Sequence, residues 1–305
     1  MQSKAIQVTG FTKAYGDFVA VDGISFSVEQ GEVFGLLGPN GAGKTSTLEC
    51  LEGIRRPTKG ALDVMGVDPS RNGRKLHNLI GVQLQTSGLP ATMQVDEAMR
   101  FFSAYHGVTP RYDLVDRLGL SEKRDSQYAE LSTGQQRRLA LALAVAHRPA
   151  VLFLDEPTAG LDVGSRSELH VLIRELQSEG TTIILATHDM AEAEKMADRV
   201  AILLQGKVVV TGTPRELTAT GAGFTKVSVR TEKSLLCENG IAFPAVHRRL
   251  VKDEYTVYFS KDPGPTVSGV LAYLTEKQET LVDLRVERPS LEERFLEITQ
   301  TGGMS

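Results

Sequence analysis

Three features of the sequence predict an α/β fold followed by a small α+β domain. Strand-like and helix-like segments alternate over about the first 220 of 305 residues. A glycine-rich loop joins one of these strands to a helix, and a second, shorter alternation starts after residue 220. Such alternation is typical of a sheet covered by helices. We therefore expect two domains, 1–220 and 221–305, each of an ordinary size for a domain.

The expected strands of the first domain are short apolar runs, and several are nearly continuous, as in a sheet buried on both faces. They are Ala5–Thr9, Gly23–Val28, Val33–Leu37, Ala61–Val64, Ile80–Gln83, Val151–Leu154, Thr182–Ala186, Val200–Leu204 and Lys207–Thr211. One intervening helix is expected to start with a capping box of Ser165 and Glu168 and to stop at Gly180.

The strand rhythm is interrupted between residues 86 and 127. This stretch reads as helices, Val95–His106 and Arg111–Leu118, and a further helix, Gln136–Ala146, follows. We expect a helical subdomain, about 86–147, inserted into a mixed-sheet core.

The second domain has its own pattern of elements. Gly221 and Gly223 indicate a linker. The expected order is then strand, short helix, two strands, helix and strand: Thr225–Arg230, Glu232–Glu238, Ala245–Val251, Tyr255–Ser260, Thr266–Glu276 and Leu281–Glu287. This β-α-β-β-α-β order favours a ferredoxin-like fold. A last helix should begin at a capping box of Ser290 and Glu293.

Composition limits the possible functions. The formal net charge is −4, which argues against a nucleic-acid partner held by bulk positive charge. Cys50 and Cys237 match no zinc or redox spacing, and this usage fits a reducing cytosol. The most apolar stretch, Leu139 to Leu154, is interrupted by charged residues and a proline, and the N-terminus leads directly into a strand. We expect a cytoplasmic protein.

The glycine-rich loop fits the pattern G-x-x-x-x-G-K-[ST] between an apolar strand and a helix. In this setting backbone N–H groups and a helix N-terminus face phosphate oxygens. Lys44 would reach the β- and γ-phosphates of a nucleotide, and the Thr45 hydroxyl would ligate Mg²⁺. The expected nucleotide-binding residues of the loop are Gly38, Pro39, Asn40, Gly41, Ala42, Gly43, Lys44, Thr45 and Ser46.

Two carboxylates end the apolar strand Val151–Leu154. Asp155 would hold Mg²⁺ at the edge of the nucleotide crevice. Glu156 is positioned to polarise the attacking water as general base. An isolated Asp-Glu pair would read as a solvated turn, so this interpretation depends on the phosphate loop earlier in the chain.

Twenty residues before Asp155 stands Leu131-Ser132-Thr133-Gly134-Gln135. Here the sequence resembles the ABC (ATP-binding cassette) ATPase family, whose signature is L-S-G-G-Q; Thr133 departs from it. The resemblance covers residues 4–220 and implies a P-loop NTPase ABC cassette that binds ATP and Mg²⁺. It also implies that Ser132, Gly134 and Gln135 bind the γ-phosphate held by an opposite subunit.

Four further positions match the family. Gln85 looks like the Q-loop glutamine that senses Mg²⁺ and the attacking water, and Asp162 like the D-loop residue at the dimer interface. His188 looks like the switch histidine on the γ-phosphate. Tyr15 looks like the aromatic residue that stacks on adenine.

The resemblance also implies partners. Two cassettes would sandwich two ATP molecules, as a homodimer or with a similar subunit, on the cytoplasmic face of a membrane permease encoded separately. Candidate residues for a groove that receives the permease are Leu89, Met93, Phe101, Phe102 and Tyr105, although helical spacing also fits ordinary core.

The C-terminal run Arg288–Ile298 is similar to the tail of ATPase subunits of bacterial drug and polysaccharide exporters, so we expect an exporter. An importer ATPase, and a soluble ABC ATPase that acts as a switch without a permease, stay open. For the second domain a dimer contact, a regulatory site and a structural extension stay open too.

Overall fold

The computed structural model describes residues 3–84, 88–219, 223–237 and 241–302. The chain divides into two compact units, 1–214 and 215–305, and each is described by itself. The division lies a few residues before the boundary expected at 220.

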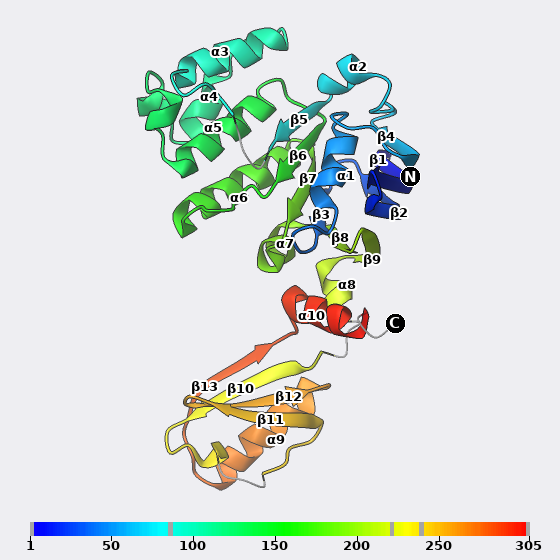
Figure 1. Ribbon diagram of the computed structural model, residues 1–305. Helices are drawn as coiled ribbons and strands as arrows, with labels where there is room; N and C mark the ends of the chain where they lie inside the picture. The colour runs from blue at the N-terminus through cyan, green and yellow to red at the C-terminus, as the bar shows by residue number, and fades with distance from the viewer. Residues whose placement is uncertain (1–2, 85–87, 220–222, 238–240, 303–305) are drawn as a thin grey trace. The chain divides into compact units, whose positions relative to one another are not determined.

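Two sheets form the framework of the first unit (Figure 1). The antiparallel sheet has the order β2-β1-β4, with β1 at Lys4–Tyr15, β2 at Phe18–Glu29 and β4 at Lys59–Val64. The second sheet has the order β5-β6-β7-β3-β8-β9 and is parallel apart from its antiparallel edge strand β9. Its strands are β3 (Val33–Leu37), β5 (Ile80–Gln83), β6 (Val151–Asp155), β7 (Thr182–Thr187), β8 (Arg199–Leu204) and β9 (Lys207–Gly212).

The first strand is longer than expected. The sequence predicts an end at Thr9, but β1 continues to Tyr15. Gly10 has φ +55°, and the pairing with β2 shifts register between Val8 and Phe11. An irregularity of this kind, which glycine tolerates, lets a strand continue past a break in its apolar pattern.

The helices of the first unit surround the parallel sheet. They are α1 (Lys44–Leu51), α2 (Gly73–His77), α3 (Val95–Tyr105), α4 (Tyr112–Arg117), α5 (Thr133–Val145), α6 (Val163–Ser178) and α7 (Met190–Met196), with 3₁₀ turns at Ser121–Lys123 and Tyr128–Glu130. Helices α3, α4 and α5 gather on one side, between β5 and β6 in the chain (Figure 1). The insertion expected from the sequence is therefore helical; α2 and α7 were not predicted.

The start of α6 corrects one prediction. Its N-cap is Asp162, not Ser165. The Ser165 N–H donates to Asp162 Oδ1 at 3.0 Å, and the Ser165 hydroxyl donates to Asp162 Oδ2 at 2.8 Å. Glu168, the expected second member of the box, instead pairs with Arg138 at 2.8 Å. An aspartate in this position satisfies the free amides of the first turn itself.

Alternate residues of the central strands pack in two different cores. Val151 and Phe153 of β6 belong to the core shared with the antiparallel sheet and α1, whereas Leu152 and Leu154 face the core under α5 and α6. Strands covered on both faces must be apolar throughout, which explains the continuous runs.

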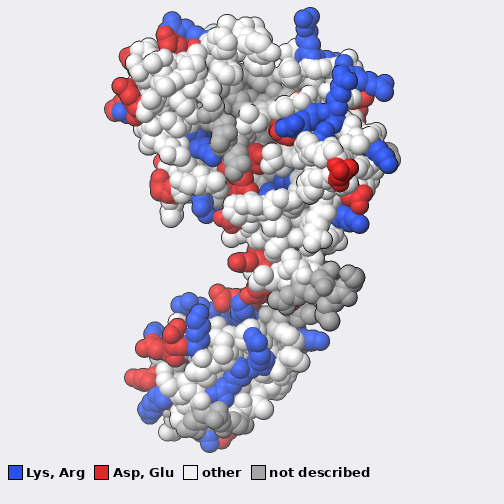
Figure 2. Space-filling model, viewed as in Figure 1, with Lys and Arg blue, Asp and Glu red and all other residues white. Residues whose placement is uncertain are grey.

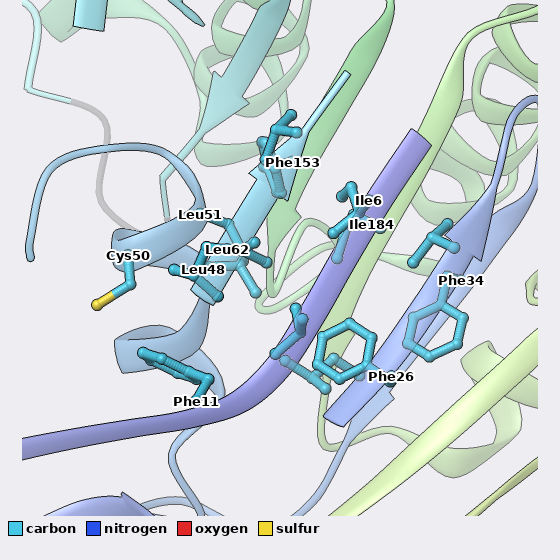
Figure 3. Close-up of a cluster of buried hydrophobic side chains, with 14 of the residues drawn as sticks. Ile6, Phe11, Phe26, Phe34, Leu48, Cys50, Leu51, Leu62, Phe153 and Ile184 are labelled. Carbon is cyan, nitrogen blue, oxygen red and sulfur yellow. The ribbon is translucent and has the colours of Figure 1, made fainter. Parts of the chain in front are cut away.

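Figure 3 shows the first of these cores. The Phe26 and Phe34 rings stack with centroids 5.3 Å apart and planes 7° apart. Leu48 and Leu51 of α1 are buried in the same cluster, and so is Cys50, where burial raises the pKa of its thiol to about 11. This packing fixes α1, and with it the loop that precedes it.

The second unit contains an antiparallel sheet of order β11-β12-β10-β13. Its elements are α8 (Pro214–Ala219), β10 (Thr225–Thr231), a 3₁₀ turn (Leu235–Cys237), β11 (Val246–Lys252), β12 (Tyr255–Ser260), α9 (Pro263–Glu276), β13 (Leu281–Glu287) and α10 (Leu291–Gly302). Val227, Val229 and Tyr258 form a core with Val270 and Leu274 of α9. The Ser290 hydroxyl accepts from the Glu293 N–H at 3.2 Å, as expected for the start of α10.

The α-helix expected at Glu232–Glu238 is wrong in the described residues, which form a short 3₁₀ turn at Leu235–Cys237. Ser234 has φ +57°, which a helix cannot accommodate. The N–H of Glu232 donates to the Thr280 carbonyl at 3.1 Å, and that of Lys233 to Glu279 Oε1 at 2.6 Å. These long-range bonds hold the backbone away from a helical path.

Candidate nucleotide site

The glycine-rich loop joins the end of β3 to the start of α1 at the carboxyl edge of the parallel sheet. A Cβ at Gly38 would lie 2.3 Å from the Leu203 carbonyl oxygen, and one at Gly43 would lie 2.6 Å from the Ala20 carbonyl oxygen. Side chains at these positions would push the loop off its path. The loop therefore turns tightly against β8 and β2, as a phosphate cradle at a helix N-terminus requires.

A cleft of about 200 Å³ opens over this loop. It is lined by Tyr15, Phe18, Ala20, Pro39–Ser46, Asp155 and Glu156. Strands β3, β6 and β7 are neighbours and run parallel, so their carboxyl ends meet at one edge, where ligands of open α/β sheets bind. The structure thus brings together residues predicted from three distant parts of the sequence.

Lys44 lies buried beneath the loop. Its Nζ donates to the Gly38 carbonyl at 2.8 Å and to the Pro39 carbonyl at 3.4 Å, and it lies 3.5 Å from Glu156 Oε1. The ammonium group is thus directed at the cleft and compensated by oxygen atoms around it.

Asp155 ends β6 beside the loop. Its Oδ2 accepts from the Thr45 hydroxyl at 3.1 Å, while its buried Oδ1 has no partner among the described residues. Burial raises the pKa of this carboxyl, and the charge of Glu156 adds to the rise, whereas the Thr45 bond opposes it. A buried carboxylate with a free oxygen beside a hydroxyl suits a hard cation. No cluster of three or more His, Cys, Asp or Glu suited to a metal ion occurs in the described part of the chain.

Glu156 has the most contacts of the site carboxylates. Its backbone is left-handed, with φ +50°, a rare conformation for a residue with a side chain. Its Oε2 accepts from the Thr187 hydroxyl at 3.3 Å and lies 2.9 Å from His188 Nδ1. The opposite oxygen, Oε1, is buried and accepts no hydrogen bond from a described residue, although the Lys44 ammonium lies 3.5 Å away. Thr187 was not predicted, although its place directly before His188 was a signal.

Two aromatic residues line the outer part of the cleft. The Tyr15 hydroxyl is 3.2 Å from Ser46 Oγ, and its ring has Lys13 and Arg55 nearby at 4.8 and 5.4 Å from the centroid. Phe18, across the turn between β1 and β2, is 64% exposed. The sequence analysis missed Phe18, which the short turn brings beside Tyr15.

Six predicted residues are not among those that line this cleft, and one more lies outside the described residues. The six are Gly38, which starts the loop, His188, which contacts Glu156, and Ser132, Gly134, Gln135 and Asp162. Ser132 caps α5: its hydroxyl accepts from the Gln135 N–H at 3.3 Å, and the Gln135 side chain accepts from the Ser132 N–H at 2.9 Å. Gly134 is in the first turn of α5, and Asp162 caps α6. Gln85 falls on the segment 85–87, outside the description.

The mixed sheet, the loop before α1 and the carboxylates after β6 define the chain as a P-loop nucleoside triphosphatase. A family model described as "ABC transporter" matches residues 21–159. The Nod factor export ATP-binding protein I of Paraburkholderia xenovorans is 36% identical over 98% of both chains. The chain belongs to the ABC transporter family as an ATP-binding subunit, and such cassettes hydrolyse ATP.

Two further comparisons agree. The daunorubicin resistance ATP-binding protein DrrA3 of Streptomyces coeruleorubidus is 35% identical, over 98% of this chain and 97% of that one. A solved structure of an ATP-binding subunit of an ABC transporter superposes with a TM-score of 0.66 at 25% identity, over 70% of this chain and 91% of that one. Among the helices of the described residues, none has the length and apolar character needed to cross a membrane.

Proposed function

We propose that this chain is the ATPase subunit of an ABC exporter and that it drives a separately encoded membrane permease. The observation that supports ATP hydrolysis most directly is the arrangement around Glu156, whose carboxylate contacts Lys44, Thr187 and His188. Relatives named for Nod factor export and daunorubicin resistance match nearly the whole chain, including the second unit. Their names support export over import.

The predicted residues at and beside the cleft have proposed roles. Lys44 neutralises charge on the β- and γ-phosphates, and the amides of residues 39–43 donate to phosphate oxygens. Glu156 accepts a proton from the attacking water, and His188 positions its carboxylate and reaches the γ-phosphate. Tyr15 stacks on the adenine ring, with Ser46 holding its hydroxyl.

Thr45 and Asp155 would hold Mg²⁺, with Gln85 as a further contact. Their hydroxyl and carboxylate oxygens are the donors that Mg²⁺ prefers. The ion supplies charge neutralisation at the phosphates. Asp155 Oδ1 is the buried oxygen without a partner among the described residues, which supports its role as a ligand.

The signature residues would act on the ATP of a second cassette, in a homodimer or with a similar subunit. In this chain Ser132, Gly134 and Gln135 lie at the N-terminus of α5, away from the cleft, where free amides and the helix dipole favour an anion. Thr133 is the first residue of this helix and its side chain is exposed. Asp162 caps the start of α6, and Ser165 in the first turn of that helix lies beside Gly134. A Cβ at Gly134 would lie 3.1 Å from the Ser165 hydroxyl oxygen. This packing supports a single surface, formed by the starts of α5 and α6, that contacts the nucleotide bound to the second cassette.

The permease would dock on the helical side of the first unit. Leu89, Phe102 and Tyr105 line a cavity there, and Tyr105 is 67% exposed. Of the other candidates, Met93 packs against the core and Phe101 is exposed without lining the cavity. Lys and Arg side chains gather around α2 on the visible face (Figure 2). Helix α2 also supplies His77 to the cavity wall. Such cations favour the anionic lipids of a cytoplasmic leaflet, which supports a peripheral location.

Co-expression with a candidate permease tests the proposal. The chain should move to the membrane fraction only with the permease, and the pair should extrude substrate. The Glu156→Gln chain should still reach the membrane but extrude nothing. If the chain stays out of the membrane fraction beside every permease encoded near it, the exporter proposal fails and the permease-free switch replaces it.

A further inference from the structure

A second cavity, of about 390 Å³, lies on the first unit between β5 and the helices α3 and α5. It shares no residue with the nucleotide cleft. Most of its wall is apolar, including Ile80, Leu89, Phe102 and Leu143. Its size and character are those of a site that receives a ligand or a protruding side chain.

Two buried polar side chains at this cavity lack partners. Gln83, at the end of β5, is 1% exposed, and neither its amide nitrogen nor its amide oxygen is hydrogen-bonded to a described residue. Glu52, directly after α1, is 3% exposed, and its Oε2 has no partner among them either. Unpaired buried polar atoms are costly, so such atoms at a cavity indicate an occupant that satisfies them.

The charge of the cavity wall points to the nature of that occupant. Glu52 is the only Asp, Glu, Lys or Arg among the described lining residues. His106 and His147 stack with centroids 3.8 Å apart. Burial lowers the pKa of both imidazoles. The neighbouring rings lower it further, His77 for His106 and His106 for His147, so both rings are neutral at neutral pH. The cavity therefore offers one carboxyl group in an apolar wall with no cation to balance it.

We propose that the permease segment that docks in this cavity carries a single Lys or Arg on its apolar face, and that this cation pairs with Glu52. This proposal rests on the permease docking proposed above and specifies which charged groups would pair at the docking site. A cation entering an apolar site needs a carboxylate partner, and a buried carboxylate needs a cation. Gln83 can accept from the same group and donate to a backbone carbonyl beside it.

Selection of peptides on the full-length chain tests the proposal. A displayed library of random 16-residue peptides is selected on the immobilised protein, and the recovered peptides are synthesised with a fluorescent label. Tyr105→Ala, at the exposed rim, identifies the peptides that occupy the cavity because only these lose affinity. We expect these peptides to carry one Lys or Arg within an apolar face. Glu52→Gln should weaken their binding at least about tenfold.

Two matched changes separate charge pairing from general damage. Glu168→Gln removes an exposed carboxylate that pairs with Arg138 and does not line the cavity, so it should leave affinity unchanged. Replacing the peptide's Lys or Arg by Gln should cost as much as Glu52→Gln, and the two changes together should cost little more than one.

The two proposals fail in different ways. Cavity-binding peptides that lack a basic residue, or that bind Glu52→Gln as well as the wild type, overturn the pairing but leave docking standing. If no recovered peptide responds to Tyr105→Ala, the docking surface is wrong, and the pairing falls with it.

Discussion

Glu156 Oε2 and His188 Nδ1 lie 2.9 Å apart, although the two residues follow different strands. Glu156 comes after β6 and His188 after β7, and these strands are parallel neighbours. The Glu156 N–H donates to the Ala186 carbonyl at 2.9 Å, which ties the end of one strand to that of the other. The left-handed backbone of Glu156 then turns its carboxylate toward Lys44 and His188.

Replacing Glu156 by Gln should separate nucleotide binding from turnover. Gln keeps the shape of the side chain but cannot accept the proton of the attacking water. We expect ATP to bind with unchanged or higher affinity and turnover to fall by roughly 10²- to 10⁴-fold, the range for a general base. Phosphate release and binding of a fluorescent ATP analogue measure the two effects. Glu168→Gln, an exposed carboxylate paired with Arg138, is the control. Near-normal turnover of Glu156→Gln would refute this role.

Lys44→Ala should weaken nucleotide binding itself. The buried ammonium is the cation held at the loop by Gly38 and Glu156, and its loss leaves the phosphates without that donor. A hydrogen bond to a charged group contributes about 1.5–3 kcal/mol, so ATP affinity should fall roughly 10- to 100-fold. Titration with the same analogue gives the affinity, with exposed Lys59→Ala as control. An unchanged affinity would exclude this reading of the loop.

Contiguous patterns in the sequence predicted much of the site. The phosphate loop, Asp155 and Glu156 are recognisable because each is a short run next to an apolar strand. Thr187 was indicated only by its place before His188, and Phe18 only by the short turn after Tyr15. Glu52 could not be recognised at all, because only tertiary packing brings it to the cavity.

The wrong start of α6 and the wrong helix at Glu232–Glu238 have a common origin. Both were patterns that match a rule locally but lose to other hydrogen bonds. Asp162 lies three residues before Ser165 and takes the cap position that the sequence also allowed at Ser165. The run Glu232–Glu238 has helical composition, yet bonds from the backbone of Glu232 and Lys233 to Thr280 and Glu279 hold its start away from a helix, and a 3₁₀ turn follows at Leu235–Cys237.

ATP should convert Glu156→Gln from monomer to dimer. None of the described residues that line the cleft of one chain belongs to the signature. The binding site for the γ-phosphate is therefore complete only when α5 of a second cassette presents its N-terminus. Gel filtration with and without ATP and Mg²⁺ measures the change, and ADP is the control. A dimer at all times would indicate that the second unit dimerises. No dimer at all would mean that Thr133 has weakened the signature or that the partner is a different cassette.

A chain that ends at Ala219 should fold and bind ATP. Both large cores of the first unit lie within residues 5–203, and every residue that lines the cleft precedes 157. We expect a cooperative thermal transition and an ATP affinity within about twofold of the full chain. Aggregation of the shortened chain, under conditions in which the full chain stays monodisperse, would place the domain boundary elsewhere.

Glu52→Gln should stabilise the protein, and increasingly so as the pH rises. The carboxyl of Glu52 has a pKa of about 8 in the folded chain against an ordinary value of 4.5, chiefly because it is buried. Between these values the folded chain holds a proton that the unfolded chain has released, so the wild-type free energy of unfolding falls with rising pH. Gln holds no such proton, and its advantage should grow from about pH 4.5 and level off above pH 8. At 1.4 kcal/mol per pKa unit, the difference at pH 8 should be on the order of 4 kcal/mol.

Urea unfolding of wild type and Glu52→Gln at pH 5 and pH 8, with EDTA and without nucleotide, measures this difference. Glu168→Gln, an exposed carboxylate that pairs with Arg138, is the matched control and should show no such growth. A difference between wild type and Glu52→Gln that stays the same at both pH values would show that Glu52 is ionised in the folded chain. An ionised Glu52 must already be solvated or paired in the free protein, and the cavity would then not require a cation from a partner.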